Sequence, residues 1–490
     1  LAMKPGEEAD DLSRRRDLWV VASMQKVVQT CIKVEYERAG DEMVPGSASG
    51  FIALRNGPEQ TVVARLAREH AANTRGAICT GWIDYSQLFM SIVKSCQWET
   101  ERFCGVHPGV TEIVRMLHSE VTGRYETAHG LTERYEVLKG SGQGCINGAT
   151  RAKLALVLTQ RVVEKSCKGF GFTLDPTRHI CEGWYADDAC LIASSPHELR
   201  KMMECCWMIA KMSGLQINIK GKKKTAWAGT YWTTDRRGMA VEKDIDCGEW
   251  KLRMPDGEEV PQIKMGKDED VNYYKHLGSE MGPGFTGGQD RVRAKVIARC
   301  IGVIGVIGGI KGLGITAMND AIESAVEGVV DYYGRACVLT WEDMQKVEAA
   351  RAAAIQRATG VWMVPRRLLW GSREMGGMGR RHLYAKAAEA LFDQFDRMLA
   401  GGAGEPGRAA VETMIADTCY RLGCRGRTPL EWMPVHLEGV LSDESLVEGW
   451  LKIKIRSRRI AVQAGGQNVA DRGPLAAQVW DVEDELLRGP

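Results

Sequence analysis

Apolar residues recur along the chain in patterns that predict both strands and helices. The segment Ala77–Phe89 begins as an apolar strand, and short apolar runs flank a polar centre in the segment Glu182–Ser195. The second pattern predicts two strands joined by a tight turn. From about residue 291 to residue 381 the apolar spacing is helical, which predicts a set of helices.

A helix is expected directly after the predicted hairpin. Ser195 suits the N-cap, Pro196 suits the first turn and Glu198 occupies the capping-box position. Apolar residues then follow at helical spacing until Gly214, which is typical of a helix end. They are Leu199, Met202, Met203, Cys206, Ile209, Ala210 and Met212. Two strands packed against this helix would form a rigid support.

The composition is that of a large globular protein. A chain of 490 residues has room for more than one domain and a large core. The formal net charge of +2 predicts no partner, so any site for a polyanion must come from local clustering. Fifteen cysteines without a CxxC pair favour reduced thiols, and hence an intracellular location in the cytoplasm, the nucleus or both.

Zinc sites and membrane segments are not expected. Two cysteine and histidine trios lack a fourth partner at a convincing spacing: Cys96, Cys104 and His107, and Cys419, Cys424 and His436. The longest apolar run, Cys300–Ile310, is glycine-rich and too short to span a bilayer. No secretory signal opens the chain. Because it begins with Leu1 and not with Met, we expect a fragment or a processed piece whose upstream domains are missing. The oligomeric state is left open.

Two adjacent carboxylates, Asp187 and Asp188, stand at the centre of the predicted hairpin, with no Lys or Arg beside them. Neighbouring strand residues point to opposite faces, so both can serve one site only at a bend. Crowded carboxylates repel each other unless a cation lies between them, and Mg²⁺ takes oxygen ligands together with substrate phosphates. The alternative is a solvated loop, as expected for Asp10 and Asp11.

Asp84 ends the first predicted strand and is a candidate third carboxylate for the same site. The alternative is an Asp that caps the next helix. Further along, Lys139–Gly144 forms a glycine loop that lets the backbone approach a ligand closely, although it matches neither a P-loop nor a dinucleotide fingerprint.

Basic residues gather between Arg351 and Lys386, where Glu374 is the single acid and Trp362 and Trp370 are interleaved. The basic residues are Arg351, Arg357, Arg366, Arg367, Arg373, Arg380, Arg381 and Lys386. Phosphate neutralisation and aromatic stacking hold nucleic-acid strands, so this segment is a candidate nucleic-acid surface. The alternative is a basic helix face with the tryptophans in the core.

Taken in order, these features resemble reverse transcriptases, most closely those of non-long-terminal-repeat retrotransposons. The resemblance covers roughly residues 14–380 and rests on five motifs in the family's order. They are the strand ending at Asp84, the loop Gln143–Gly144, the Tyr-Ala-Asp-Asp hairpin Tyr185–Asp188, the Gly-Leu-x-x-Asn segment with lysines Gly214–Lys224, and the aromatic Leu-Gly-Ser segment Tyr274–Ser279. Each motif is weak by itself, whereas the series is specific.

The resemblance implies an α+β right-hand polymerase fold. Fingers and a palm with an antiparallel sheet would occupy residues 1–285, a helical thumb residues 286–372, and a helical C-terminal extension of unassigned function residues 373–490. The implied reaction adds dNTPs to the 3′-hydroxyl of a DNA primer on an RNA template, with two Mg²⁺ ions, or Mn²⁺ in their place. No membrane partner is implied.

The resemblance also implies roles for individual residues. Asp84, Asp187 and Asp188 match the catalytic, metal-binding carboxylates, and Phe89 matches the side chain that excludes a ribose 2′-hydroxyl. The residues implied to contact the nucleotide are Tyr85, Phe89, Gln143, Gly144, Tyr185, Lys223 and Lys224. The resemblance implies nucleic-acid contacts for Tyr274, Leu277 and Gly278, and the basic segment described above adds Arg351, Arg357, Arg366 and Arg367.

Some positions depart from the family's pattern without removing a metal ligand. Arg16-Asp17-Leu18 stands in place of Arg-Pro-Ile, Leu88 and Met90 replace Ala and a frequent second Asp, and Cys145-Ile146-Asn147-Gly148 replaces Pro-Leu-Ser-Pro. These departures leave open a weakened or domesticated copy that binds nucleic acid without catalysis. The nearest enzymatic alternative is a maturase-like or RNA-templated RNA polymerase, against which Phe89 argues.

Overall fold

The computed structural model describes residues 23–50, 52, 55–124, 126–127, 130–141, 145–219, 225–247, 250–254, 256–264, 273–282, 288–310, 312–360, 382–402, 404–423 and 439–463. Contacts divide the chain into two compact units. Unit 1 comprises residues 1–60, 77–231 and 243–274, and unit 2 comprises residues 61–76, 232–242 and 275–490. Both predicted domain boundaries, after residues 285 and 372, lie outside the described residues, so the three-domain division stays a prediction.

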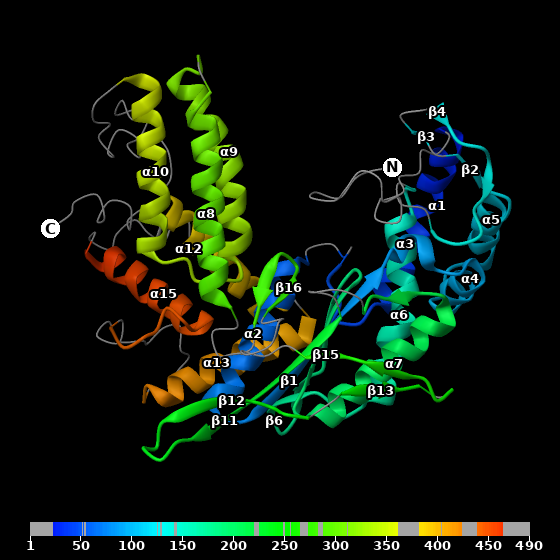
Figure 1. Ribbon diagram of the computed structural model, residues 1–490, viewed down its shortest axis with the longest axis horizontal. Helices are drawn as coiled ribbons and strands as arrows, with labels where there is room; N and C mark the ends of the chain where they lie inside the picture. Colours follow the sequence, from blue (N-terminus) through cyan, green and yellow to red (C-terminus); the bar gives the residue numbers. More distant parts are fainter. Residues whose placement is uncertain are drawn as a thin grey trace. The chain divides into compact units, whose positions relative to one another are not determined.

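A mainly antiparallel sheet of seven strands forms the frame of unit 1 (Figure 1). Its strands run in the order β12-β11-β1-β9-β8, while β10 pairs with β1 and β15 pairs in parallel with β11. The bounds are β1 (Ala77–Ser86), β8 (Glu182–Tyr185), β9 (Asp188–Ala193), β10 (Gln216–Ile217), β11 (Ala226–Thr234), β12 (Ala240–Asp244) and β15 (Ile263–Lys264). The expected α+β class with an antiparallel sheet is confirmed; the right-hand arrangement stays a prediction.

Short strand pairs and helices complete the described chain. The pairs are β2 (Thr122–Gly123) with β5 (Tyr135–Glu136), β3 (Glu126–Thr127) with β4 (Gly130–Leu131), β6 (Phe172–Asp175) with β7 (Arg178–Ile180), β13 (Lys251–Arg253) with β14 (Glu259–Pro261), and β16 (Tyr274–His276) with β17 (Ser279–Met281). The helices of unit 1 are α1 (Ser23–Met43), α3 (Leu88–Ser91), α4 (Lys94–Phe103), α5 (Pro108–Ser119), α6 (Gly148–Ser166) and α7 (Pro196–Ser213). Helix α2 (Gly57–Asn73) begins in unit 1 and continues in unit 2.

One face of the sheet is packed against α7. A Cβ atom added to Gly81 of β1 would lie 3.0 Å from Leu199 Cδ1 and 3.1 Å from Met203 Sδ, both of α7. Ile83 and Tyr85, which lie two and four residues further along β1, are buried in the same core. Because successive strand residues alternate between faces, the even-numbered residues of β1 lie on the face away from α7.

The features predicted for α7 are confirmed with two exceptions, of which the first is the capping box: the Glu198 carboxylate accepts its hydrogen bond from the Ser194 N–H at 3.2 Å and not from the N-cap residue Ser195. The Ser195 side chain accepts a hydrogen bond from the Glu198 N–H, Pro196 opens the helix, and Gly214 ends it with φ 75°. Six of the seven predicted apolar positions are buried, whereas Met212 is 71% exposed. Met212 lies out of phase with the buried stripe, close to the end of the helix, so its side chain faces solvent.

Unit 2 contains the predicted helices. They are α8 (Gln289–Gly308), α9 (Ile315–Gly334), α10 (Trp341–Thr359), α12 (Leu383–Leu399), α13 (Gly404–Arg421) and α15 (Leu446–Gln463). Helix α8 packs against α9 and α10, and α12 packs against α9, around buried residues such as Val296, Ile322 and Met344. In the ranges that the structure describes, no helix is both long and apolar enough to cross a membrane.

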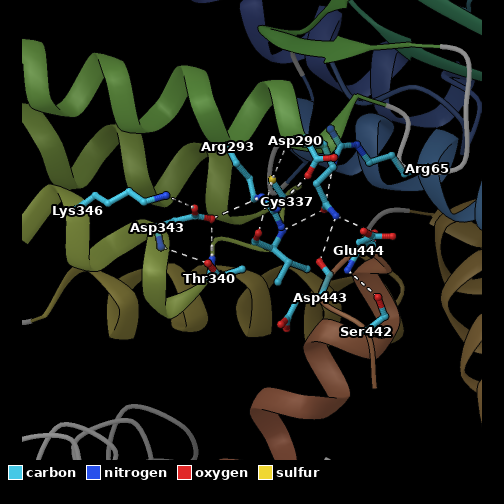
Figure 2. Close-up of polar contacts among 12 residues, drawn as sticks. Arg65, Asp290, Arg293, Cys337, Thr340, Asp343, Lys346, Ser442, Asp443 and Glu444 are labelled. Atoms are coloured by element: carbon cyan, nitrogen blue, oxygen red, sulfur yellow. Dashed lines mark hydrogen bonds and ion pairs between the residues drawn. The ribbon is translucent and has the colours of Figure 1, made fainter. Parts of the chain in front are cut away.

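The start of α8 is the polar centre of unit 2 (Figure 2). The Gln289 side chain is 2% exposed, and its Oε1 accepts hydrogen bonds from the Arg65 guanidinium at 3.3 Å and the Val338 N–H at 3.2 Å. Its Nε2 donates to the Glu444 carbonyl at 2.7 Å and to the Asp443 carbonyl at 3.4 Å. One buried amide therefore joins α2, α8, the turn before α10 and the segment that leads into α15.

Helix α15 is also anchored on α2. The Glu69 carboxylate accepts hydrogen bonds from the Ser445 hydroxyl and the Leu446 N–H, each at 2.8 Å. Burial raises the pKa of Glu69 to about 7. His70 pairs with Asp417 of α13 at 2.6 Å. The helices α13 and α15 are therefore packed against α2 in unit 2.

We predict that Gln289→Ala destabilises unit 2 by about 2–3 kcal/mol, because the substitution leaves several buried polar groups without their partner. Urea unfolding followed by tryptophan fluorescence would measure the change in the free energy of unfolding. Gln356→Ala, the same substitution at a half-buried position of α10, serves as the control and should cost less than about 1 kcal/mol. Equal losses in the two variants would contradict the role given to Gln289.

Candidate active site

The register of β1 and β9 sets Asp84 directly opposite Asp188. Directly opposed residues of an antiparallel pair lie on one face, with Cβ atoms about 4.5–5.5 Å apart. Trp82 and Cys190 are the next partners along that face. Two half-buried carboxylates therefore meet on the face of the sheet away from α7.

Asp187 lies in the two-residue turn that joins β8 to β9. Tyr185 pairs with Asp188, which leaves Ala186 and Asp187 at the tip, so the predicted hairpin is confirmed. Ala186 has φ 54°. This left-handed conformation costs a residue with a Cβ atom roughly 1–2 kcal/mol. A strained backbone therefore stands beside the two acids, as is frequent at functional sites.

The segment Ser47–Gly50 fixes this turn from one side. The Ser49 N–H donates to the Trp184 carbonyl at 2.7 Å, and the Trp184 N–H donates to the Ser47 carbonyl at 3.0 Å. Gly50 then passes so close to the turn that an added Cβ atom would lie 2.0 Å from the Ala186 nitrogen. Only glycine fits at this position, and its close approach holds the tip of the hairpin.

Glu182, the first residue of β8, is a buried carboxylate near the base of the hairpin. It is 3% exposed and accepts a hydrogen bond from the Ser47 hydroxyl at 3.1 Å. Burial raises the pKa of Glu182 to about 7. The protonated form is therefore stabilised in the folded protein around neutral pH.

Tyr274 covers part of the face that bears the acids. Its ring stacks on Trp82 with ring centroids 5.2 Å apart and an interplanar angle of 14°. Burial raises the pKa of Tyr274, and the carboxylates of Asp188, Asp84 and Asp187 raise it further. All three acids are thus close enough to act on one phenol. The ring is only 2% exposed, so it is not presented as an open surface for nucleic acid.

The acids suit a hard divalent cation. Within the described ranges, no three His, Cys, Asp or Glu side chains are grouped so that they could hold a metal ion. The backbone pairing joins Asp84 to Asp188, with Asp187 in the adjoining turn. Mg²⁺ is usually bound by one or two carboxylates together with waters and substrate phosphates. This donor set therefore fits Mg²⁺ or Mn²⁺ whose coordination a phosphate completes.

Two predicted nucleotide contacts that follow Asp84 in the sequence, Tyr85 and Phe89, are packed against the core of unit 1. Tyr85 is buried in the core on the α7 side of the sheet and is not brought to the carboxylates. Phe89 lies in α3, half-buried against the same core, and its carbonyl accepts a hydrogen bond from the Ser141 N–H at 2.8 Å. Gln87 is the N-cap residue of α3, so the alternative in which Asp84 caps the next helix is wrong.

One of the remaining predicted nucleotide contacts lies beside the acids. Tyr185 is half-buried at the end of β8, opposite Asp188. Gln143, Gly144, Lys223 and Lys224 lie outside the described residues.

The structure contradicts the nucleic-acid contact predicted for Arg351. Its side chain is 1% exposed and donates to Asn319 Oδ1 at 2.8 and 3.1 Å. Helical spacing places Arg351 on the buried face of α10, together with Val347 and Ala354, which the linear count of basic residues did not take into account. Arg357 is exposed. Arg366 and Arg367 lie outside the described residues.

Leu277 and Gly278 form the turn between β16 and β17. Both have positive φ, 49° and 80°. The Leu277 carbonyl accepts a hydrogen bond from the Tyr332 hydroxyl at 2.6 Å, and the Gly278 carbonyl accepts one from the Tyr333 hydroxyl at 3.3 Å. Two tyrosines of α9 therefore hold this turn, and the sequence analysis missed them because nothing in the linear pattern connects them with it.

No protein-family model matches the chain, and the comparison with curated proteins finds no relative. Among solved structures it is similar to telomerase from Candida albicans in complex with a TWJ fragment of telomeric RNA, with 8% identity, a TM-score of 0.34, and coverage of 81% of this chain and 55% of that chain. Apo telomerase from Candida tropicalis gives 9% identity, a TM-score of 0.34, and coverage of 87% of this chain and 60% of that chain. The chain thus spans less than two thirds of these telomerase chains. Likeness at this level does not assign the fold.

We predict that Gly50→Ala displaces the turn at Ala186 and destabilises unit 1 by roughly 2–4 kcal/mol, because the new methyl group would overlap the backbone. Thermal unfolding would measure the loss. Gly302→Ala, a helical position where an added Cβ atom meets nothing within 4 Å, is the matched control and should be neutral or stabilising. A Gly50→Ala protein as stable as the control would show that the close approach does not constrain the hairpin.

The raised pKa of Glu182 predicts a specific pH dependence of stability. A carboxyl group whose pKa is about 7 in the folded protein and about 4.5 when unfolded stabilises the fold fully below pH 4.5. This stabilisation is lost as the pH rises through 7, by at most about 3 kcal/mol. Glu182→Gln mimics the protonated form, so its free energy of unfolding should fall less than that of the wild type between pH 5 and 8. Parallel plots of the free energy of unfolding against pH for the two proteins would refute the raised pKa of Glu182. The variant Glu69→Gln provides the same comparison for unit 2.

Proposed function

We propose that this chain is an RNA-directed DNA polymerase, retrotransposon-derived, which adds dNTPs to a primer 3′-hydroxyl on an RNA template. The observation that carries the proposal is the position of Asp84 opposite Asp188, beside Asp187 in the turn. These are the three carboxylates that the order of sequence motifs singles out. They come from segments about a hundred residues apart in the sequence, and the pairing of β1 with β9 brings them together.

The acids act by presenting negative oxygens in a fixed arrangement. Asp84 and Asp188 lie on two strands whose separation is set by backbone hydrogen bonds, so little rearrangement is needed when a cation and a nucleotide bind. When bound, Mg²⁺ supplies stabilisation of the charge on the attacking and leaving oxygens of nucleotidyl transfer. A nucleophilic side chain is not required, because the primer hydroxyl attacks and positioning carries most of phosphoryl-transfer catalysis.

The choice of deoxynucleotides rests on the role that the resemblance gives to Phe89. Phe89 follows Asp84 by five residues, at the point where β1 passes into α3. Gly140 packs against the backbone of Phe89, since a Cβ atom on Gly140 would lie 2.7 Å from the Phe89 carbonyl oxygen. The adjacent Leu88, one of the departures from the family's pattern, is buried in the core. That departure is therefore accommodated by packing in the core.

The second candidate is a domesticated protein that binds nucleic acid without catalysis. The departures at Met90 and at residues 145–148 favour it. The acids speak against it, because two directly opposed carboxylates repel each other when no cation lies between them.

We predict that primer extension on an RNA template with Mg²⁺ and dNTPs falls by about 100-fold or more in Asp84→Asn and in Asp188→Asn, because each change removes a charged oxygen from the site. Extension of a labelled DNA primer would measure the rate. Asp246→Asn is the matched control, since its carboxylate is 88% exposed in unit 1, and it should retain wild-type activity. Failure of the wild type to extend would favour the binding protein, whereas full activity of both acid variants would remove these residues from the mechanism.

A further inference from the structure

Two cysteines of unit 1 face each other across the packing of α6 and α7. Cys167 is the C-cap residue of α6, and Cys205 lies in the middle of α7. Their sulfur atoms are 3.9 Å apart, which is van der Waals contact for two thiols. Small side-chain adjustments would bring such a pair to the bonding distance of a disulfide, about 2.05 Å.

The two thiols are unequal. Cys167 is buried, while Cys205 is half-buried and has Lys201 one turn earlier on the same helix. The hydrogen bond with Cys167 lowers the pKa of Cys205 to about 7. Burial and the negative charge of Glu204 act against this shift, and the positive charge of Lys201, which pairs with Glu204 at 2.9 Å, acts with it. Cys205 is therefore the thiol of the pair that becomes a nucleophilic thiolate near neutral pH, with Cys167 placed to react next.

The neighbouring cysteines lack this combination. Cys206 is fully buried, and burial raises its pKa well above the ordinary value. Burial likewise raises the pKa of Cys181 to about 12. Both remain thiols at neutral pH, so they are internal controls for any reaction at Cys205.

We propose that Cys167 and Cys205 form an oxidant-responsive pair that closes to a disulfide when the protein meets a peroxide. The Cys205 thiolate attacks one oxygen of hydrogen peroxide, hydroxide leaves, and Cys205 becomes a sulfenic acid. The sulfur of Cys167 then attacks that of Cys205, and the departing hydroxide takes up the Cys167 proton as water. The hydroxide released in the first step takes up the proton lost by Cys205, so two thiols and one hydrogen peroxide give one disulfide and two waters.

The position of the pair gives the disulfide a structural consequence. The two cysteines are 38 residues apart, and the segment between them contains β6, β7, β8 and β9. A disulfide between Cys167 and Cys205 would close a loop that includes the hairpin with Asp187 and Asp188. This loop would restrict the conformations of the unfolded chain and so favour the folded state. This inference does not depend on the proposed function.

The test is oxidation of the folded, reduced protein with hydrogen peroxide, blocking of the remaining thiols and digestion with trypsin. Trypsin releases Cys167 in residues 166–168, and Cys205 together with Cys206 in residues 202–211. We expect these two peptides to be joined in the wild type and in Cys206→Ser, with reversal by dithiothreitol, and to be separate in Cys205→Ser. In Cys167→Ser the sulfenic acid on Cys205 should persist and be trapped by dimedone.

Thermal unfolding gives a second readout. The oxidised wild type should unfold roughly 5 °C above the reduced protein, and Cys205→Ser should show no such shift. Linkage of Cys205 to Cys206 or Cys181, or a Cys167 link that forms only in denaturant, would overturn the proposal. So would oxidation of the exposed Cys31 under conditions that leave Cys167 and Cys205 reduced.

Discussion

The candidate site depends on a single register between β1 and β9. In this register Gly81 lies opposite Leu191 and Asp84 lies opposite Asp188. A slip of one residue would turn Asp84 into the core that contains Leu199 and Met203, where an unpaired carboxylate is costly. It would also move Gly81, the residue against which α7 packs, to the other face. Core packing and the position of the acids are thus fixed by the same pairing.

The residues packed around the hairpin restrict the movement of the acids. Gly50 lies against the backbone of Ala186, which has a left-handed conformation at the tip of the hairpin. The stacked rings of Trp82 and Tyr274 cover the neighbouring part of the sheet face that bears the acids. The base of the hairpin is buried at Glu182. Charged oxygens on such a rigid support need little reorganisation when charge develops in a substrate, which is the main way in which proteins stabilise phosphoryl transfer.

The sequence predicted those features that depend on local spacing. The hairpin at Asp187, the capped start of α7 at Ser195 and its end at Gly214 all follow from short patterns, and the structure has them. Arg351 and Tyr274 show why other features could not be predicted. Their residue types suggest contact with nucleic acid, yet each is buried by a partner distant in the sequence, Asn319 and Trp82 respectively. The steric requirement for glycine at position 50 could not be predicted either, because it arises from contact with Ala186, which is distant in the sequence.

The most direct test of the central claim is Mn²⁺ binding in the presence of template, primer and a nonhydrolysable nucleotide, followed by electron paramagnetic resonance. If Asp84 and Asp188 share a cation, Asp84→Asn and Asp188→Asn should each weaken Mn²⁺ binding substantially. The double variant should then bind little more weakly than either single variant, because the removal of one partner already disrupts the shared site. A common site would be contradicted if the losses of Mn²⁺ binding free energy in the two single variants added up in the double variant. An unchanged Mn²⁺ affinity in either single variant would contradict it as well.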